Sequence, residues 1–362
     1  MTLDRLLSRR LLFVLGPGGA GKTSLAAALG LLAAERGRRA LVLTLDPARR
    51  LAEALRLVAG ERVFSPEELR AAAVAAAAPL EAAVFDPRRS WIDLLAREVP
   101  DLETRRRLLT HPFFVRLSED LAGSREYAAL AEILALFRAG RHDLVILDTP
   151  PAEHGLDFLD AAERVLAALD ADALSWLAPL GLARRALRLT GWASGYIART
   201  LARFTGAAFL EELGGFLELG SVLLPRVRER AAELRALLQS EECGSVLVTR
   251  AGEGPVRDAL SLWAAVTRRA RRPEAVVANL LTPRADRLGD AALDPAARAG
   301  AERVLSFLAA IAEGEQAALA RLREGLPAGA TLVRVPAIPG EIVDLAGLAR
   351  LCRALQRAFA EA

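Results

Sequence analysis

The sequence predicts an α/β protein built on a doubly wound, mostly parallel sheet that is flanked by helices and carries an inserted helical subdomain. Three observations carry this prediction. Short apolar runs alternate with longer helical patterns through most of the chain. One of these runs is followed by a glycine-rich turn that opens a helix. Residues 157–240 instead show helical periods broken by glycines. We therefore expect one domain, residues 1–362, with residues 157–240 inserted in it.

The first apolar run, residues 11–15, predicts a buried strand, and residues 24–35 predict a helix. The turn between them, Gly-Pro-Gly-Gly-Ala-Gly-Lys-Thr-Ser, matches the phosphate-binding pattern G-x-x-x-x-G-K-[ST]. Glycines let backbone N–H groups approach phosphate oxygens, and the helix N-terminus adds its positive dipole end. Lys22 can neutralise the β- and γ-phosphates, and the Thr23 hydroxyl can ligate Mg²⁺. The predicted nucleotide-binding residues are Gly16, Gly18, Gly19, Ala20, Gly21, Lys22, Thr23 and Ser24.

Lys22 is the single lysine of the chain, and the other 47 of the 48 basic residues are arginine. In a sequence that otherwise uses arginine, lysine occurs only at position 22. This suggests that position 22 needs a compact ammonium on a flexible side chain, which a planar guanidinium cannot replace. This observation favours a phosphate-binding loop over a glycine-rich turn that matches the pattern by chance.

Two aspartates follow predicted strands. The run of residues 40–45 ends at Asp46-Pro-Ala, and because parallel strands end at one edge, Asp46 is expected beside the loop. An ordinary Asp-Pro turn explains Asp46 equally well. The strand at residues 142–147 is followed by Asp148, the usual partner of a phosphate loop, whose carboxylate supports Mg²⁺. The loop after it contains Thr149, Pro150, Pro151 and His154, and its prolines make it a stiff segment suited to sensing hydrolysis. His154 is either a switch residue in this loop or a loop histidine without a role.

The rest of the chain returns to alternating strands and helices. Residues 49–81 are expected to form a helix and a connector, and residues 91–137 are expected to be helical with interruptions near Pro100, Pro112 and Gly123. Further strands are expected at residues 81–85, 245–249, 275–278 and 331–335, and further helices at residues 256–269, at 295–324 and at the C-terminus.

Composition narrows the classes of function. The two cysteines, Cys243 and Cys352, are far apart, which argues against a disulfide framework and a cysteine-built zinc site. The N-terminal residues are too charged for a signal peptide, and no apolar run is long enough to span a bilayer. The net charge is only +3, without a basic run that contains aromatic residues. We expect a cytoplasmic protein with no integral membrane segment and no nucleic-acid partner.

The phosphate loop, the Leu-Asp-Pro-Ala stretch at residues 45–48 and the stretch from Asp148 to His154 together resemble the nucleotide site of the anion-transporting ATPases. That family includes the arsenical-pump ATPase and the tail-anchored-protein targeting ATPase. The resemblance implies ATP and Mg²⁺ as cofactors, Asp46 as the residue that orients or deprotonates the attacking water, Asp148 as the Mg²⁺ support and residues 149–154 as a switch. It also implies a homodimer that closes over two nucleotides.

The same resemblance assigns adenine-binding loops to Asn279 and to the segment from Pro336 to Ile342, which includes Glu341. ATP is expected over GTP because Asn279 is not followed by the Lys-x-Asp of guanine readers. The chain departs from the family at Pro17, where the extra signature lysine would stand. Proline has neither a charge nor a backbone N–H, so either an arginine substitutes or hydrolysis is slow. The cysteines that bind zinc or arsenite in relatives are missing as well.

Three functions remain open. The first is an ATPase whose cycle opens and closes a homodimer, with residues 157–240 either handling a protein client or forming a second helical core. The second is a nucleotide-gated scaffold with little turnover, which Pro17 favours. The third is a partition-type ATPase, for which the mildly basic segment 345–359 is weak support because a core-packing helix explains it as well.

Overall fold

A computed structural model describes residues 2–45, 55, 61–120, 124–170, 215, 219, 223–269, 272–283, 294–342 and 344–362. The elements in chain order are α1 (Leu3–Leu7), β1 (Leu11–Leu15), α2 (Lys22–Glu35), β2 (Ala40–Thr44), β3 (Glu61–Phe64), α4 (Pro66–Ala71), β4 (Leu80–Val84), α5 (Pro87–Glu98), α6 (Leu102–Thr110), α7 (Pro112–Asp120), α8 (Ser124–Ala139), β5 (Leu144–Asp148), α9 (Ala152–Asp170), α13 (Leu224–Gln239), β6 (Cys243–Arg250), α14 (Glu253–Arg268), β7 (Ala275–Leu281), α15 (Pro295–Gly325), β8 (Thr331–Pro336) and α16 (Leu345–Ala360).

The strands form one eight-stranded sheet in the order β3-β4-β2-β5-β1-β6-β7-β8. All neighbours pair in parallel except β3, which runs antiparallel to β4. β1 lies at the centre between β5 and β6, and the chain visits the strands on either side of it in separate stretches. The predicted doubly wound, mostly parallel sheet is confirmed.

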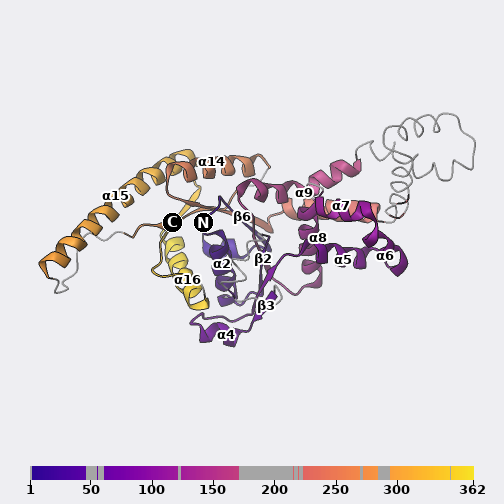
Figure 1. Cartoon of the computed structure of the whole chain (residues 1–362), viewed down its shortest axis with the longest axis horizontal. Coiled ribbons are helices and arrows are strands. Elements are labelled where there is room, and N and C mark those ends of the chain that lie inside the picture. Colours follow the sequence, from indigo (N-terminus) through magenta and orange to yellow (C-terminus); the bar gives the residue numbers. More distant parts are fainter. Residues whose placement is uncertain are drawn as a thin grey trace, which may run out of the picture. The chain divides into compact units, whose positions relative to one another are not determined.

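The central strands are buried on both faces, which is why they read as uninterrupted apolar runs. Alternate residues of the strands, such as Leu12 and Val14 of β1, share one core with α1, α2 and α16. Helix α2 is buried on nearly all sides because it lies between the sheet and α16 (Figure 1). A Cβ on Gly30 of this helix would come within 2.6 Å of Val42 Cγ2, so glycine lets α2 approach the sheet closely. Helices α14 and α15 lie side by side, and α14 packs on β6.

The sequence-based prediction was wrong for residues 61–64, which form the edge strand β3 instead of part of a connector. The short strand carries little apolar signal because Glu61 is exposed and Val63 is 60% exposed. An edge strand of this kind is held by its hydrogen bonds to β4 more than by burial of its side chains. Its conformation therefore depends on pairing with β4, whose partner residues lie 16 to 22 positions downstream.

The chain divides into two compact units. The first holds the sheet and consists of residues 1–85, 140–156 and 239–362; the second is helical and consists of residues 86–139 and 157–238. The helical unit thus uses two chain segments, of which the sequence indicated only the later one as an insertion. Most of residues 171–222 lie outside the described part of the chain, so the predicted domain division stays a prediction.

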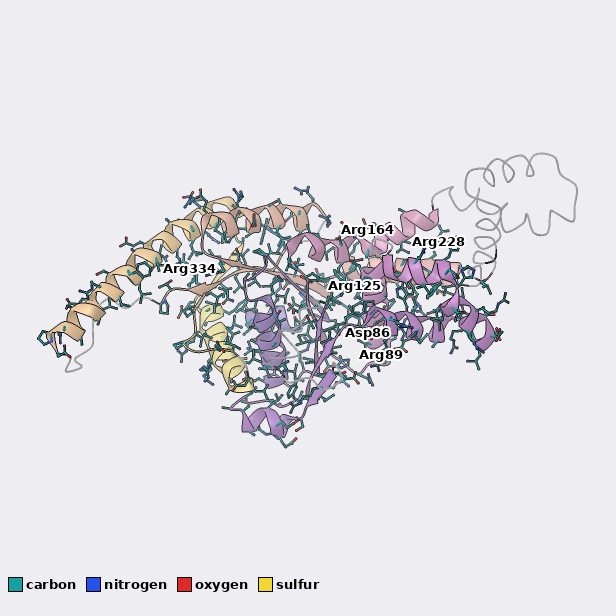
Figure 2. All side chains as sticks on the ribbon, in the orientation of Figure 1. Asp86, Arg89, Arg125, Arg164, Arg228 and Arg334 are labelled. Carbon is teal, nitrogen blue, oxygen red and sulfur yellow. The ribbon has the colours of Figure 1, made fainter. Side chains whose placement is uncertain are left out.

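Side-chain contacts within the helical unit explain where α5 begins and which helix its C-terminal end contacts. Asp86 caps α5 by accepting hydrogen bonds from the backbone N–H groups of Arg88 and Arg89 at 2.9 and 3.1 Å. Figure 2 labels Asp86 and Arg89, which lie near each other. Glu98, at the end of the same helix, is buried and accepts a hydrogen bond from Nε of Arg230 on α13 at 2.8 Å. These contacts fix where α5 begins and which helix its end packs against.

Among the described residues, no helix has both the length and the apolar character needed to cross a membrane.

Candidate functional site

The phosphate loop runs from the end of β1 to the start of α2, and its glycines meet different steric demands. Gly16, Gly19 and Gly21 have φ values of 155°, 74° and 87°, which L-residues with side chains rarely adopt. A Cβ on Gly16 would lie 2.1 Å from the carbonyl oxygen of Val248, and one on Gly21 would lie 2.4 Å from Nδ2 of Asn279. A Cβ on Gly18 would meet no atom of the described residues within 4 Å. The backbone geometry therefore requires glycine at 16 and 21, whereas no described residue fills the space beside Gly18.

Lys22 is the first residue of α2 and is only 8% exposed. Its Nζ donates a hydrogen bond to the carbonyl oxygen of Pro17 at 3.1 Å, so the side chain folds back along the loop. Pro17 lacks an N–H donor, but its carbonyl helps to place the ammonium group. The single lysine of the chain thus lies at the loop, as the sequence predicted.

Asp148, the last residue of the central strand β5, is 1% exposed. Its Oδ2 accepts hydrogen bonds from Oγ1 of Thr23 at 2.8 Å and from Oγ1 of Thr44 at 2.9 Å. Strand pairing explains this meeting, because Thr44 of β2 and Val14 of β1 are the register partners of Asp148. The contact of Thr44 was not predicted from the sequence. A threonine near the carboxyl end of an apolar strand could have indicated a polar contact at this edge of the sheet.

This donor set fits a magnesium ion bound together with nucleotide phosphates. Mg²⁺ prefers hard oxygen ligands in an octahedral arrangement and usually keeps several waters. Thr23 and Asp148 supply hydroxyl and carboxylate oxygens. No group of three His, Cys, Asp or Glu residues in the described part of the chain could hold a metal ion. Thr23 and Asp148 would support the ion, with phosphate and water completing the shell.

The segment after β5 is anchored at its start. Thr149 is fully buried, and its hydroxyl donates to the carbonyl oxygen of Val14 at 2.8 Å. Gly155 lets the first turn of α9 pack closely, since a Cβ there would come within 3.0 Å of Thr149 Oγ1 and 3.1 Å of Leu15 Cδ2. Pro150 is half-buried and Pro151 is exposed. The side chain of His154 lies outside the described atoms, so the predicted switch role of residues 149–154 stays a prediction.

Asn279 is 4% exposed, and its Nδ2 donates to the carbonyl oxygen of Ala20 at 2.9 Å. The structure thus places it against the phosphate loop, a contact that the sequence did not predict. Asn279 lies within β7 and not in a loop, and the end of β7 is joined to the segment after β8 by a hydrogen bond from the N–H of Ala337 to the carbonyl oxygen of Leu281 at 2.7 Å. Pro336 and Glu341 are exposed, while Ile342 packs partly against the core. Contacts of these residues with adenine stay a prediction.

Asp46, the residue predicted to act on water, lies outside the described residues. The preceding residue, Leu45, donates its N–H to the carbonyl oxygen of Asp148 at 2.9 Å. The chain therefore reaches the carboxyl edge of the sheet one residue before Asp46. The role of Asp46 rests on the sequence alone.

Comparison with known proteins agrees with this geometry. A sequence profile of the family described as anion-transporting ATPase matches residues 9–180, which include the phosphate loop, Thr44 and Asp148. The uncharacterized protein SCO2128 of Streptomyces coelicolor is 34% identical over 204 residues, which cover 55% of this chain and 48% of that protein. The putative arsenical pump-driving ATPase of Halobacterium salinarum is 31% identical over 153 residues, covering 42% of this chain and 23% of that protein.

The ATPase GET3 of Malassezia globosa is 30% identical over 161 residues, covering 44% of this chain and 45% of that protein. In each case the match spans less than half the length of the relative. The chain resembles the anion-transporting ATPase family over its nucleotide-site region, and the resemblance read from the three motifs is confirmed.

Proposed function

We propose that this chain is a Mg²⁺-dependent ATPase whose nucleotide cycle opens and closes a homodimer. The observation that supports it most is the buried carboxylate of Asp148, held by the hydroxyls of Thr23 and Thr44 next to the phosphate loop. A buried carboxylate that shares a hydrogen bond with the loop threonine is the arrangement that phosphoryl-transfer sites use to support Mg²⁺. The similarity to proteins named as ATPases points to the same activity.

Different groups of the chain would bind the phosphates, neutralise their charge and orient the attacking water. Backbone N–H groups of the loop and the N-terminus of α2 bind the phosphates, and the Lys22 ammonium neutralises the charge that they carry. Bound Mg²⁺ would supply further neutralisation and fix the geometry of the phosphate oxygens. Asp46 orients the attacking water. Because phosphoryl transfer needs little covalent chemistry from the protein, positioning and charge account for the acceleration.

Dimerisation and client handling are the finer parts of the proposal. Dimerisation rests on the resemblance, and client handling rests on the glycine-broken apolar pattern in the sequence of residues 157–240. The chain lacks the cysteines associated with arsenite or with a zinc-bridged dimer, so we do not extend metalloid export or a zinc clamp to it. If aspartate substitutions of apolar residues within 157–240 left every partner interaction unchanged, the client role would be wrong.

The decisive experiment measures phosphate release from ATP and Mg²⁺ over a range of protein concentrations. Lys22→Ala and Asp46→Asn are expected to lower turnover at least 100-fold, and turnover per chain is expected to rise with protein concentration. Thr44→Val removes one of the two donors to Asp148 and is expected to cost about tenfold, near 1.4 kcal/mol. Thr267→Val is the matched control, because its hydroxyl bonds to the Trp263 carbonyl within α14.

A nucleotide-gated scaffold is the second candidate, and Pro17 is the residue that favours it. Tight ATP binding with no turnover above the Lys22→Ala background would overturn the enzyme and support the scaffold. Turnover that is independent of protein concentration, yet lost in Lys22→Ala, would keep the ATPase and overturn the dimer cycle.

A further inference from the structure

The carboxyl end of β7 departs from regular strand geometry beside the phosphate loop. Its pairing with β8 shifts between Ala278 and Leu281, and Leu280 has a φ of 59°. This left-handed conformation is disfavoured for a residue with a Cβ, so the surrounding structure must hold it. Behind the bulge, the N–H and the hydroxyl of Thr282 donate to the Glu315 carboxylate of α15 at 2.8 and 3.0 Å. The bulge is thus fixed at a defined place.

Asn279 lies within the bulge, between Ala278 and Leu281, and its side chain contacts the loop. Thr282, just after the bulge, contacts α15. The Asn279 amide is buried, and its Nδ2 donates to the carbonyl oxygen of Ala20 at 2.9 Å. The same nitrogen occupies the space that a side chain at Gly21 would need. The side-chain amide of Asn279 therefore packs closely against the peptide unit that joins Ala20 to Gly21.

Holding the Ala20 carbonyl fixes the direction of the next N–H group. A peptide unit is planar and trans, so the C=O of Ala20 and the N–H of Gly21 point in opposite directions. The bond from Asn279 therefore turns the Gly21 N–H away from β7. Gly21 is the N-cap of α2, and the backbone N–H groups at this position are those that a phosphate loop offers to its ligand. Orientation of this peptide is a condition for anion binding.

We infer that Asn279 is a positioning residue for the phosphate loop, acting on the phosphates through the Ala20–Gly21 peptide in addition to any contact with the base. The inference rests on the proposed nucleotide-binding function and deepens it. A residue that contacts only adenine matters only for ligands with a base. A residue that shapes the loop matters equally for a ligand made of phosphates alone.

The test compares the affinities for ATP and for inorganic tripolyphosphate, both with Mg²⁺, by titration calorimetry on the whole chain. Asn279→Ala is expected to weaken tripolyphosphate binding about fivefold to tenfold, for one lost buried hydrogen bond, and to weaken ATP binding by at least the same factor. Asn279→Asp keeps an acceptor oxygen that could take the adenine amino group but loses the Nδ2 donor. It is expected to weaken both ligands at least as much as the alanine variant.

Asn279→Ser, which keeps a donor in a smaller side chain, is expected to restore part of the loss for both ligands. Thr249→Val is the matched control, because Thr249 is also buried at the end of a neighbouring strand but donates to the Pro255 carbonyl at 2.9 Å. It is expected to leave both affinities within twofold of the wild type. Thermal unfolding of each variant shows whether it is folded, and the serine and aspartate variants decide the question if the alanine variant is not.

Two results would overturn the inference. Loss of ATP affinity with unchanged tripolyphosphate affinity in Asn279→Ala would make Asn279 a base contact only. Wild-type affinities in Asn279→Asp would show that the donor bond is not needed. Failure of the wild-type chain to bind either ligand would instead contradict the proposed function, and Lys22→Ala provides the background against which binding is judged.

Discussion

The two edges of the sheet both carry buried polar side chains, but they use them differently. At the carboxyl edge, Lys22 donates to a backbone carbonyl and Asp148 accepts from two hydroxyls. These bonds to neutral groups help to fix the position of each side chain. At the amino edge, where parallel strands begin, acidic side chains meet arginine or histidine side chains directly. The described contacts thus place Lys22 and Asp148 beside the phosphate loop at one edge, and join acidic and basic side chains to each other at the other.

The amino edge shows three such pairs. Glu274 accepts a hydrogen bond from Nε of Arg9 at 2.5 Å, with both side chains largely buried. Asp143 pairs with Arg39 at 2.7 Å, and the hydrogen bond from Arg39 lowers the pKa of Asp143 to about 2. Oε2 of Glu81 lies 2.7 Å from Nε2 of His142, and this hydrogen bond lowers the pKa of Glu81. Pairing of this kind stabilises the fold, and a ligand would have to displace one charged side chain in order to bind the other.

The difference teaches that burial and charge do not by themselves mark a functional site. What distinguishes the carboxyl edge is that Lys22 and Asp148 lie at a glycine-rich loop, where no described residue fills the space beside Gly18. If this distinction is correct, substitutions at the carboxyl edge should affect turnover, and substitutions at the amino edge should affect stability.

The largest effect is expected from Asp148→Asn. The amide can still accept a hydrogen bond but carries no charge, so support for Mg²⁺ is lost and ATP turnover should fall at least 100-fold, about 3 kcal/mol. Asp143→Asn, at the residue just before the same strand begins, is the matched control and should change turnover less than twofold. Steady-state phosphate release at several Mg²⁺ concentrations measures both. Equal losses in the two variants would break the distinction between the edges.

An intermediate effect is expected from Arg9→Ala. Burial raises the pKa of Glu274, and the Arg9 guanidinium opposes that rise, so removing Arg9 leaves a buried carboxylate less compensated. The free energy of unfolding should fall by about 2 kcal/mol, while turnover of the folded protein is kept. Arg10→Ala is the control, because its pair with Glu242 is solvent-exposed and should contribute less than about 0.5 kcal/mol. Denaturant unfolding gives both values, and equal losses would contradict the role of burial.

The smallest effect is a pH dependence at Asp143. Its pKa is depressed in the folded chain from an ordinary 3.8 to about 2, so the pair with Arg39 stabilises the fold above about pH 4. That contribution is lost as the pH falls from about 4 toward 2. Because the side chains are partly exposed, it should stay below about 1 kcal/mol. The difference in unfolding free energy between wild type and Asp143→Asn should therefore shrink between pH 6 and pH 3, and a constant difference would contradict the assignment.

The sequence predicted those elements whose conformation depends on a local residue pattern. Buried parallel strands need continuous apolar residues, so β1, β2 and β5 were predicted within a residue or two of their observed bounds. Strand β3 was missed because its residues are held by pairing with β4 and not by burial. A two-segment helical unit was not foreseen, since residues 86–139 look like ordinary connecting helices until their packing is seen.

The sequence by itself determined the phosphate loop, its lysine and the position of Asp148 at the end of a strand, because glycine conformation and strand burial are local properties. Only the tertiary structure decided that Thr44 holds Asp148 and that Asn279 holds the carbonyl of Ala20. Those contacts join residues 104 and 259 positions apart. They exist because β2 pairs with β5 and a bulge ends β7, and strand order and register are set by the packing of the whole sheet.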